Sequence, residues 1–341
     1  MRRLGVGAFT ILLGAGVASS EDLFEMKKVT EGVWAAIARP LPVINCNAAV
    51  IVLEDGVMVV DTHSKPSAAR ALMAQIRTIT DKPVKWVVNT HFHWDHYQGN
   101  QAYVGAWPAG TEIIASHATR EAIESRGIPR VKHEIATVPL LLERLRAERA
   151  RATAEAERQR LDDEIGARSA YLAELRSMQV TLPSLTFEKS LVIYRGARSV
   201  HVLWLGKGHT DGDVVVYLPQ DKVIVTGDLL HGWMPYMADG YPYDWIRTLE
   251  AASALDFDTV IAGHGDVMRG KERFALWARY FRDLLREAGE AYARGDTLAE
   301  ARQKVAAALR PTYGPAFGSR FDESIDGNVN KAFRVVGGVM E

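Results

Sequence analysis

The chain has 341 residues, of which 48% are hydrophobic, enough to bury the core of one large or two ordinary domains. Its 41 basic and 42 acidic residues give a net charge of -1, which argues against nucleic-acid binding through a strongly basic surface. Cys46 is the single cysteine, so the fold must be stable without an internal disulfide.

The N-terminus has the pattern of a secretory signal peptide. Two arginines precede an apolar run over 4–17, and small residues at 18–20 lead into an acidic pair. The run is short for a membrane span. We predict a signal peptide over 1–20, a mature chain over 21–341 that is periplasmic or secreted, and no stable membrane insertion after cleavage. An uncleaved N-terminal anchor is the alternative.

The first regular elements of the mature chain form a β-α-β unit. Apolar, β-branched residues over 48–53 and 57–60, separated by a Glu-Asp-Gly turn, predict a hairpin. A helix rich in Ala, Leu, Met and Ile follows near 67–79, and a buried strand over 84–89 follows the helix. This order predicts helices packed on a sheet.

Two polar residues, Asp61 and His63, follow the second strand of the hairpin. Asp61 could orient a metal ligand from behind, and His63 could line a pocket. The alternative is that both residues cap the helix that begins near residue 67. The sequence leaves these two interpretations open.

The last strand of this unit runs into Thr-His-Phe-His-Trp-Asp-His at 90–96. His91 and His93 are two residues apart, so in extended backbone both imidazoles point to one side and can reach one ion. Asp95 and His96 come as the chain turns, and they suit a second ion nearby. Imidazole and carboxylate are ligands that zinc accepts, which favours a metal site over a set of solvated loop histidines.

A change of composition follows a short strand at 111–115 and a helix that begins at residue 116 or 117. Ala, Glu and Arg dominate 143–177, with few large apolar residues, which predicts a helical hairpin inserted into the fold. Three roles are open for it: a cap over the site, an arm that forms a homodimer, or a solvated excursion without a direct role.

The second half of the chain repeats one pattern three times. His209, Asp228 and His264 each follow a glycine near the end of a predicted strand, and glycine lets the backbone turn sharply and approach an ion closely. Beyond residue 271, the apolar spacing predicts amphipathic helices that pack on the outside of the fold. The predicted strands cover 191–194, 200–204, 213–218, 223–226 and 259–261.

The motif set, H-x-H-x-D-H at 91–96 followed by a lone His, Asp and His, resembles the metallo-β-lactamase fold superfamily over about 29–268. The resemblance implies an α/β fold, a four-layered αβ/βα sandwich of two mixed sheets with helices outside and the metals at one edge. It also implies two zinc ions per chain. By position, His91, His93 and His209 would bind the first ion, Asp95, His96 and His264 the second, and Asp228 would bridge both.

The implied reaction is hydrolysis of a small-molecule substrate. Two zinc ions close together lower the pKa of a bridging water towards neutrality and provide a hydroxide nucleophile. Asp95 would be the catalytic residue that orients this hydroxide and carries a proton. No serine lies in a nucleophile-elbow pattern, so no side-chain nucleophile is expected.

Asp228 favours carbonyl-ester, thioester or lactone substrates. The β-lactamases of the superfamily generally carry cysteine or serine at its position, whereas aspartate resembles the glyoxalase II-like, lactonase-like and other esterase branches. A predicted exported chain with an aspartate at this position looks most similar to periplasmic zinc hydrolases of the quinoprotein-relay type. A β-lactamase, an iron-dependent oxygenase of the same fold and a metal-dependent binding module are the alternatives. Such oxygenases generally use one metal, so the second ligand set favours hydrolysis.

The loop after Asp228 concentrates aromatic residues beside an implied metal ligand. We predict that His231 and Tyr236 contact the substrate, because apolar walls with a few polar tips are typical of small-molecule sites. Tyr243 and Trp245 are expected to pack the loop onto the next helix. The segment 40–44 could cover the site from the other side.

Overall fold

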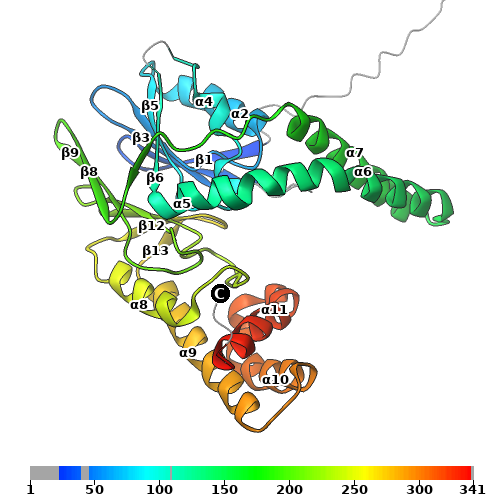
Figure 1. Ribbon diagram of the computed structural model, residues 1–341. Helices are drawn as coiled ribbons and strands as arrows, with labels where there is room; N and C mark the ends of the chain where they lie inside the picture. The colour runs from blue at the N-terminus through cyan, green and yellow to red at the C-terminus, as the bar shows by residue number, and fades with distance from the viewer. Residues whose placement is uncertain (1–22, 40–45, 108–109, 339–341) are drawn as a thin grey trace, which may run out of the picture.

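The computed structural model describes residues 23–39, 46–107 and 110–338 of the chain (Figure 1). The predicted signal peptide at 1–20 and the segment 40–44 lie outside these residues. Within the described ranges, none of the helices is long and apolar enough to cross a membrane.

The first sheet contains seven strands that lie side by side in chain order. Its first four strands form antiparallel hairpins, and the last three add in parallel. Parallel neighbours require crossover connections, which helices and the long insertion provide. The strands are β1 (Phe24–Thr30), β2 (Val33–Ala38), β3 (Ala48–Val52), β4 (Val57–Val60), β5 (Val84–Val88), β6 (Glu112–Ser116) and β7 (Leu185–Phe187).

The second sheet contains six strands in the order β13-β12-β11-β10-β9-β8. Only β11 and β12 pair in parallel, and the other pairs are antiparallel. Both sheets are therefore mixed. The strands are β8 (Ser190–Arg195), β9 (Arg198–Leu203), β10 (Val215–Leu218), β11 (Val223–Gly227), β12 (Thr259–Ala262) and β13 (Met268–Arg269).

Three apolar cores separate four layers. α2 (Pro66–Ile79) buries its apolar stripe on the outer face of the first sheet. Apolar residues of both sheets, such as Ile51 and Val216, fill the space between them. Aromatic residues of α8 (Pro242–Ser253) and α9 (Glu272–Ala293) cover the outer face of the second sheet. The predicted αβ/βα sandwich is confirmed.

The helical insertion begins earlier than predicted. Its two long helices, α6 (Ile128–Arg151) and α7 (Glu155–Ser177), extend away from the sheets (Figure 1). α5 (His117–Ala122) and a π-helix, η1 (Ile123–Gly127), run without a break into α6, so the hairpin starts well before residue 143. The composition changes only at 143 because the first turns of α6 pack against the fold and carry apolar residues.

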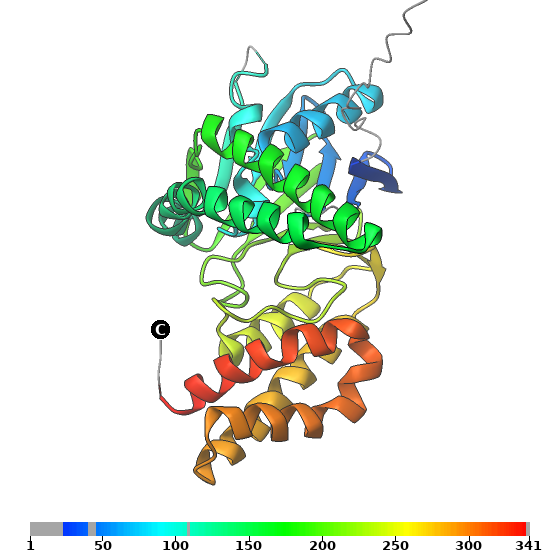
Figure 2. The ribbon, with the colours of Figure 1, turned by 90° about the vertical axis from the view of Figure 1, so that its right-hand side faces the viewer.

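The C-terminal helices form a layer outside the second sheet, as predicted. α9, α10 (Leu298–Phe317) and α11 (Ser319–Val336) pack on one another through a shared aromatic core (Figure 2). The start of α10 is fixed by a capping box between Thr297 and Glu300. α11 turns back towards the loops at the edge of the sandwich, which brings its first turns close to the site described next.

Candidate metal centre

The predicted ligands meet at one edge of the sandwich. The segment 91–96 follows β5 and runs into α3 (Trp94–Tyr97), while His209 lies between β9 and β10. Asp228 and His264 directly follow the parallel pair β11 and β12. Because each side chain comes from a strand end at the same edge, residues distant in sequence converge there.

Hydrogen bonds fix the loop that carries the histidine cluster. Asn89 donates to the carbonyl oxygen of His96 over 3.1 Å, which closes the loop on itself. The Thr90 backbone N–H donates to Asp61 over 2.8 Å, and the Val214 N–H donates to the Thr90 carbonyl over 2.9 Å. The loop is thus attached to both sheets, and its side chains are positioned before any ligand binds.

Two glycines let the backbone approach the cluster. A Cβ atom on Gly263 would lie 2.0 Å from Asp228 Oδ1, and one on Gly227 would lie 2.3 Å from Thr90 Oγ1. Gly227 also has a φ of 51°, which favours glycine. A side chain at either glycine would therefore clash with the cluster or with the loop that carries it.

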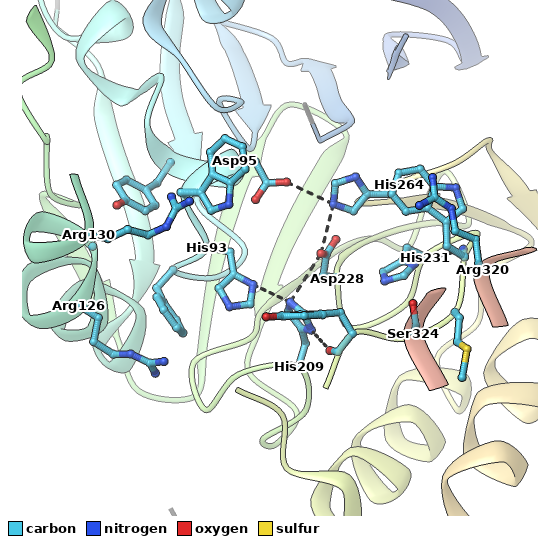
Figure 3. A pocket seen from close by; sticks show the side chains of 17 residues that line it. His93, Asp95, Arg126, Arg130, His209, Asp228, His231, His264, Arg320 and Ser324 are labelled. Carbon is cyan, nitrogen blue, oxygen red and sulfur yellow. Dashed lines mark hydrogen bonds and ion pairs between the residues drawn. The ribbon is translucent and has the colours of Figure 1, made fainter. Parts of the chain in front are cut away.

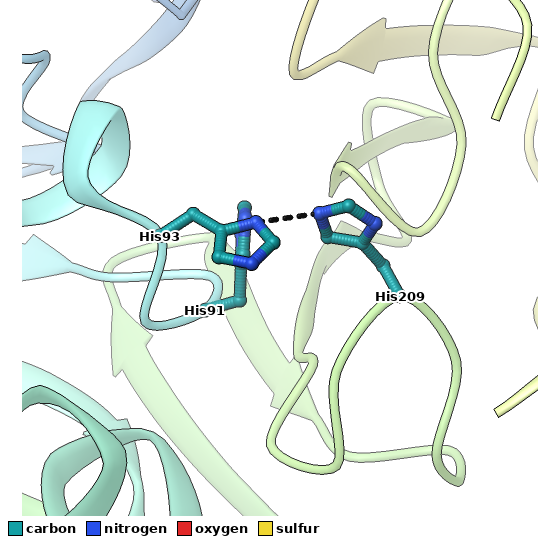
Figure 4. Close-up of side chains that lie close together, drawn as sticks. All are labelled: His91, His93 and His209. Carbon is teal, nitrogen blue, oxygen red and sulfur yellow. Dashed lines mark hydrogen bonds between the residues drawn. The ribbon is translucent and has the colours of Figure 1, made fainter. Parts of the chain in front are cut away.

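His91, His93 and His209 form the first set (Figure 4). His93 Nδ1 lies 2.7 Å from His209 Nε2, and the ring of His91 lies edge-on to both rings with centroids 4.8 and 4.9 Å away. The ligand atoms of this set all lie within 4.8 Å of one another. Three imidazoles that converge in this way suit one tetrahedral ion.

Asp95, His96 and His264 form the second set. The Asp95 Oδ2 atom lies 3.4 Å from His264 Nε2 and 3.6 Å from His96 Nε2. Asp228 lies between the two sets, with Oδ2 at 3.6 Å from His209 Nε2 and 3.3 Å from His264 Nε2. One carboxylate therefore faces both groups of imidazoles.

In four of these histidines, the ring nitrogen that points away from the cluster contacts a protein oxygen atom. This partner fixes the tautomer of an imidazole and directs its free nitrogen, as in most protein metal sites. The pairs are His91 Nδ1 with Thr90 Oγ1 at 3.1 Å, His93 Nε2 with Asp239 Oδ2 at 2.9 Å, His96 Nδ1 with Asp61 Oδ2 at 2.8 Å, and His209 Nδ1 with the Tyr236 carbonyl at 3.0 Å.

The residues fit a bound cation. Among the described residues, His91 Nε2, His96 Nε2 and Asp228 Oδ1 are buried side-chain atoms without a hydrogen-bond partner. Burying polar atoms in this way is unfavourable unless something binds them. These atoms belong to the two sets and to the carboxylate between them, so metal ions would satisfy them together.

The charges of the cluster also favour cations. Burial opposes charge on His264, but its contacts with Asp228 and Asp95 outweigh burial and raise its pKa to about 9. Burial likewise raises the pKa of Asp95, yet the neighbouring His96 and His264 outweigh it and lower that pKa to about 2. The carboxylates are thus ionised, and their negative charge keeps a proton on the His264 imidazole. A metal ion that binds there would displace this proton.

Asp61 and His63 have separate roles. Asp61 accepts hydrogen bonds from Thr90 and His96, so it orients an imidazole of the cluster. His63 is fully buried, packs on Phe24, and has its Nδ1 atom 2.9 Å from the Cys46 carbonyl. His63 does not line the cavity, and neither residue caps α2 through its side chain.

A cavity of about 600 Å³ opens over the cluster (Figure 3). His231 and Tyr236 both line it, and their contact with a substrate stays a prediction. Trp245 is buried behind it and packs the loop as expected, whereas Tyr243 is half exposed. The other lining residues are Phe92, His93, Trp94, Asp95, Tyr97, Arg126, Gly127, Arg130, His209, Asp228, Trp233, Met234, His264, Arg320 and Ser324.

Several residues around this cavity could not be predicted from the sequence. Asp239, which contacts His93, also pairs with Arg126 of the π-helix. Arg130 comes from α6, and Arg320 and Ser324 come from α11. Arginines on Arg-rich helices look like a solvated face in the sequence, so only the fold reveals which of them reach the cavity.

Comparison with known proteins identifies the family. The sequence pattern of the metallo-beta-lactamase superfamily matches residues 41–264, which include every predicted ligand. The chain belongs to this superfamily. α9 to α11 lie beyond the matched range.

Similar sequences include a sulfatase and β-lactamases. The chain is 25% identical to a linear primary-alkylsulfatase of Pseudomonas sp. (strain ATCC 19151) over 68% of its own length and 43% of that enzyme. It is 30% identical to a metallo-beta-lactamase type 2 of Elizabethkingia meningoseptica over 24% of its length and 35% of that enzyme. The chain thus spans less than half of either relative.

Solved structures share the fold. A metallo-beta-lactamase from Pontibacter korlensis matches 76% of this chain and 99% of its own, with a TM-score of 0.55 and 18% identity. The metallo-beta-lactamase FIM-1 from Pseudomonas aeruginosa, in a mono-zinc form, matches 76% of this chain and 95% of its own, with a TM-score of 0.54 and 17% identity. At these identities the likeness concerns the fold alone.

Proposed function

We propose that the protein is a dinuclear zinc hydrolase that cleaves an ester, thioester or lactone carbonyl. The observation that carries this proposal is the position of Asp228, whose carboxylate faces His209 of the first set and His264 of the second. A shared carboxylate between two sets of imidazole-rich ligands suits two zinc ions rather than one.

Each side chain then has a defined task. When bound, zinc lowers the pKa of a bound water and polarises the substrate oxygen. Asp95 lines the cavity with an ionised carboxylate, so it can accept a hydrogen bond from a water and orient it. Asp61 and Asp239 hold His96 and His93 in position.

The cavity supports a small-molecule substrate. Its volume of about 600 Å³ lies in the range of small-molecule sites. Trp94, Trp233 and Tyr236 provide aromatic walls, and the polar groups gather at the cluster. An aspartate at position 228, where the β-lactamases generally have cysteine or serine, favours the ester and lactone branches over β-lactams.

A sulfate ester is the second candidate substrate. The similarity to a linear primary-alkylsulfatase covers 68% of the chain. Arg126, Arg130 and Arg320 also line the cavity and would favour an anionic substrate. An alkyl sulfate therefore belongs in the substrate panel described next.

The proposal is tested by elemental analysis of the mature protein and by turnover of a lactone, a thioester, an aryl ester, a phosphodiester, an alkyl sulfate and a β-lactam. We expect two zinc ions per chain and a preference for the first three. His91→Ala should abolish turnover, whereas His117→Ala, on an exposed histidine of α5, should not. One iron per chain without hydrolysis, or rapid turnover of the β-lactam alone, would contradict the proposal.

We also propose that the protein is exported and forms a homodimer through the hairpin of α6 and α7. Export rests on the pattern of residues 1–20, and N-terminal sequencing of the periplasmic protein would test cleavage there. The dimer rests on the extension of the hairpin away from the sheets (Figure 1). Light scattering would compare the mature chain with a variant in which a short Gly-Ser loop replaces 147–164. A monomeric mature chain would contradict the dimer.

A further inference from the structure

The wall of the cavity nearest the hairpin carries hydrogen-bond donors that lack acceptors. Arg126 and Arg130 lie on this side, Arg320 and Ser324 lie on the opposite side, and Asp95 and His93 lie between them (Figure 3). A substrate over the cluster would therefore have cationic groups on two sides.

Arg130 is the arginine with a free, buried amino group. Its Nη2 atom donates to Glu134 Oε1 over 2.6 Å, whereas its Nη1 atom is buried and has no partner among the described residues. Arg126 pairs with Asp239, and Arg320 pairs with Glu323 over 2.8 Å. Both of those side chains are about half exposed, so water can solvate their remaining donors.

The Arg130 guanidinium is held in place. It lies over the Trp94 ring, 4.7 Å from the centroid, and is bound on one edge by Glu134. Glu134 is in turn near the Tyr171 hydroxyl, which donates to Gln98 Oε1 over 2.9 Å. A guanidinium fixed in this way loses little conformational freedom when it binds a ligand.

Tyr97 adds a second donor to the same wall. Its hydroxyl is buried and has no hydrogen-bond partner among the described residues. The hydroxyl lies against the turn that carries Arg130, since a Cβ on Gly127 would come within 2.4 Å of it. The absence of a Cβ at Gly127, the last residue of the π-helix, makes this contact possible. Such helical turns are frequent at functional sites.

Each unpartnered atom of this wall can donate a hydrogen bond, although the Tyr97 hydroxyl can also accept one. Gln98 Nε2, next to Tyr97 in the chain, is also buried without a partner. An unsatisfied buried donor is destabilising, and several together are unfavourable unless an acceptor binds them. An oxyanion offers several acceptor lone pairs and a negative charge, and therefore matches an arginine beside a hydroxyl.

We propose that Arg130 and Tyr97 form an oxyanion-binding subsite that selects substrates carrying a carboxylate or sulfate group. The inference rests on the proposed hydrolase function, because it assigns the scissile bond to the metal cluster and the anionic group to the hairpin wall. Tyr97 lies in α3, which follows β5, and Arg130 lies in the first turn of α6, at the base of the hairpin. The insertion therefore helps to set substrate specificity.

Matched substrates test the subsite. Turnover of 4-acetoxybenzoate and 4-acetoxybenzenesulfonate would be compared with that of 4-acetoxybenzamide, which has the same acetate ester, no charge and no second ester. The protein should prefer the anionic esters, and the better of the two would identify the preferred oxyanion. Arg130→Gln should lower the anionic-to-neutral ratio of kcat/KM about tenfold or more, and Tyr97→Phe should lower it less.

Two variants serve as comparators. Arg144→Gln, on an exposed arginine farther along α6, should keep the ratio. Arg320→Gln changes the opposite wall of the cavity. If the anionic-to-neutral ratio of kcat/KM falls in Arg320→Gln but not in Arg130→Gln, the assignment is overturned. If Arg130→Gln does not fold, Arg130→Lys keeps the charge but loses the two-pronged donor geometry, and it should still lower the ratio.

Binding without turnover separates this inference from the proposed function. Calorimetry would measure benzoate and benzenesulfonate binding to the mature protein and to Arg130→Gln at equal metal content. Binding that depends on Arg130, without hydrolysis of any ester, would leave the subsite standing and contradict the ester hydrolase. Ester turnover without a charge preference, together with equal anion binding by both proteins, would overturn the subsite and leave the hydrolase standing.

Discussion

At the scale of single residues, the cluster depends on which nitrogen of each imidazole is held. His96 and His93 are oriented by carboxylates, Asp61 and Asp239, and His209 is oriented by a backbone carbonyl. The sequence identified the seven candidate ligands because they cluster at strand ends. It could not identify Asp239, because a lone aspartate in a loop has no spacing that relates it to His93.

Replacing Asp61 with asparagine should weaken one ion specifically. Asp61 has a φ of 64°, which asparagine tolerates, so the backbone should be kept. If the oxygen of the new side-chain amide still accepts the hydrogen bond from the Thr90 N–H, its NH₂ group points at His96 Nδ1. His96 Nδ1 must then accept a hydrogen bond from that NH₂ group. The proton of His96 would move to Nε2, the atom that faces the cluster. We expect zinc affinity at this site to fall about 10- to 100-fold, measured by competition with a chromophoric chelator.

Asp55→Asn is the matched control for this change. Asp55 is an exposed carboxylate in a hairpin turn that pairs with Lys85, and it is distant from the cluster. Its substitution should leave both zinc affinities unchanged. Equal zinc affinity in Asp61→Asn and in the unaltered protein would show that Asp61 does not set the tautomer of His96.

His63 should make the fold sensitive to acid. Burial lowers the pKa of His63 to about 4, against about 6.5 for an exposed histidine. The neutral ring is therefore favoured in the folded state. Its contribution to the unfolding free energy is complete above about pH 6.5 and is lost as the pH falls towards 4. It amounts to roughly 3 kcal/mol of unfolding free energy.

Urea unfolding between pH 7 and pH 4 measures this effect, with chelator present so that metal release does not contribute. His63→Asn suits the comparison because His63 has a φ of 70°, which asparagine also tolerates. The unfolding free energy of the variant should fall less steeply with acid. Parallel curves for both proteins would mean that His63 is not the group that titrates.

At the scale of elements, the sequence predicted the strands that end in candidate ligands and missed the helices that complete the cavity. β5, β11 and β12 are short apolar runs with clear boundaries, so their ends could be located. The base of α6 and the first turns of α11 carry arginines among other charged residues. Helical periodicity shows which face is apolar, but it cannot show that Arg130 or Arg320 reaches a cavity formed by other segments.

The C-terminal helix α11 should stabilise the loop over the cavity. Asn328 is buried and donates to the Pro235 carbonyl over 2.9 Å, and its amide nitrogen also lies 3.0 Å from the Tyr280 hydroxyl. Asn328→Ala removes these bonds and should lower the unfolding free energy by about 1–3 kcal/mol, measured by urea unfolding. It should also raise KM, because the loop carries Tyr236 and Asp239.

Asn330→Ala gives a comparison within the same helix. Asn330 accepts a hydrogen bond from Arg302 of α10. Its substitution should lower stability without a change in KM. If Asn328→Ala lowers stability to the same extent and also leaves KM unchanged, α11 has no part in holding the loop.

At the scale of the whole molecule, the candidate metal centre joins the two sheets. Four predicted ligands follow β5 of the first sheet, and His209, Asp228 and His264 follow strands of the second. The resemblance of the motif set to the superfamily implied this sandwich, and the structure confirms it. The packing of α9 to α11 could not be predicted in the same way, because it depends on aromatic contacts between helices that are distant in sequence.

Removal of the metals should therefore weaken the association of the two halves. Ions that bind only the folded state add a stabilisation of about 4 kcal/mol per site when free zinc exceeds the dissociation constant about a thousandfold. Thermal unfolding with zinc and with chelator should show a lower midpoint after chelation. Asp228→Ser should show a smaller difference, because it removes the carboxylate that faces both sets. An unchanged midpoint in the unaltered protein would contradict metal binding between the two sheets, since such ions must contribute to holding them together.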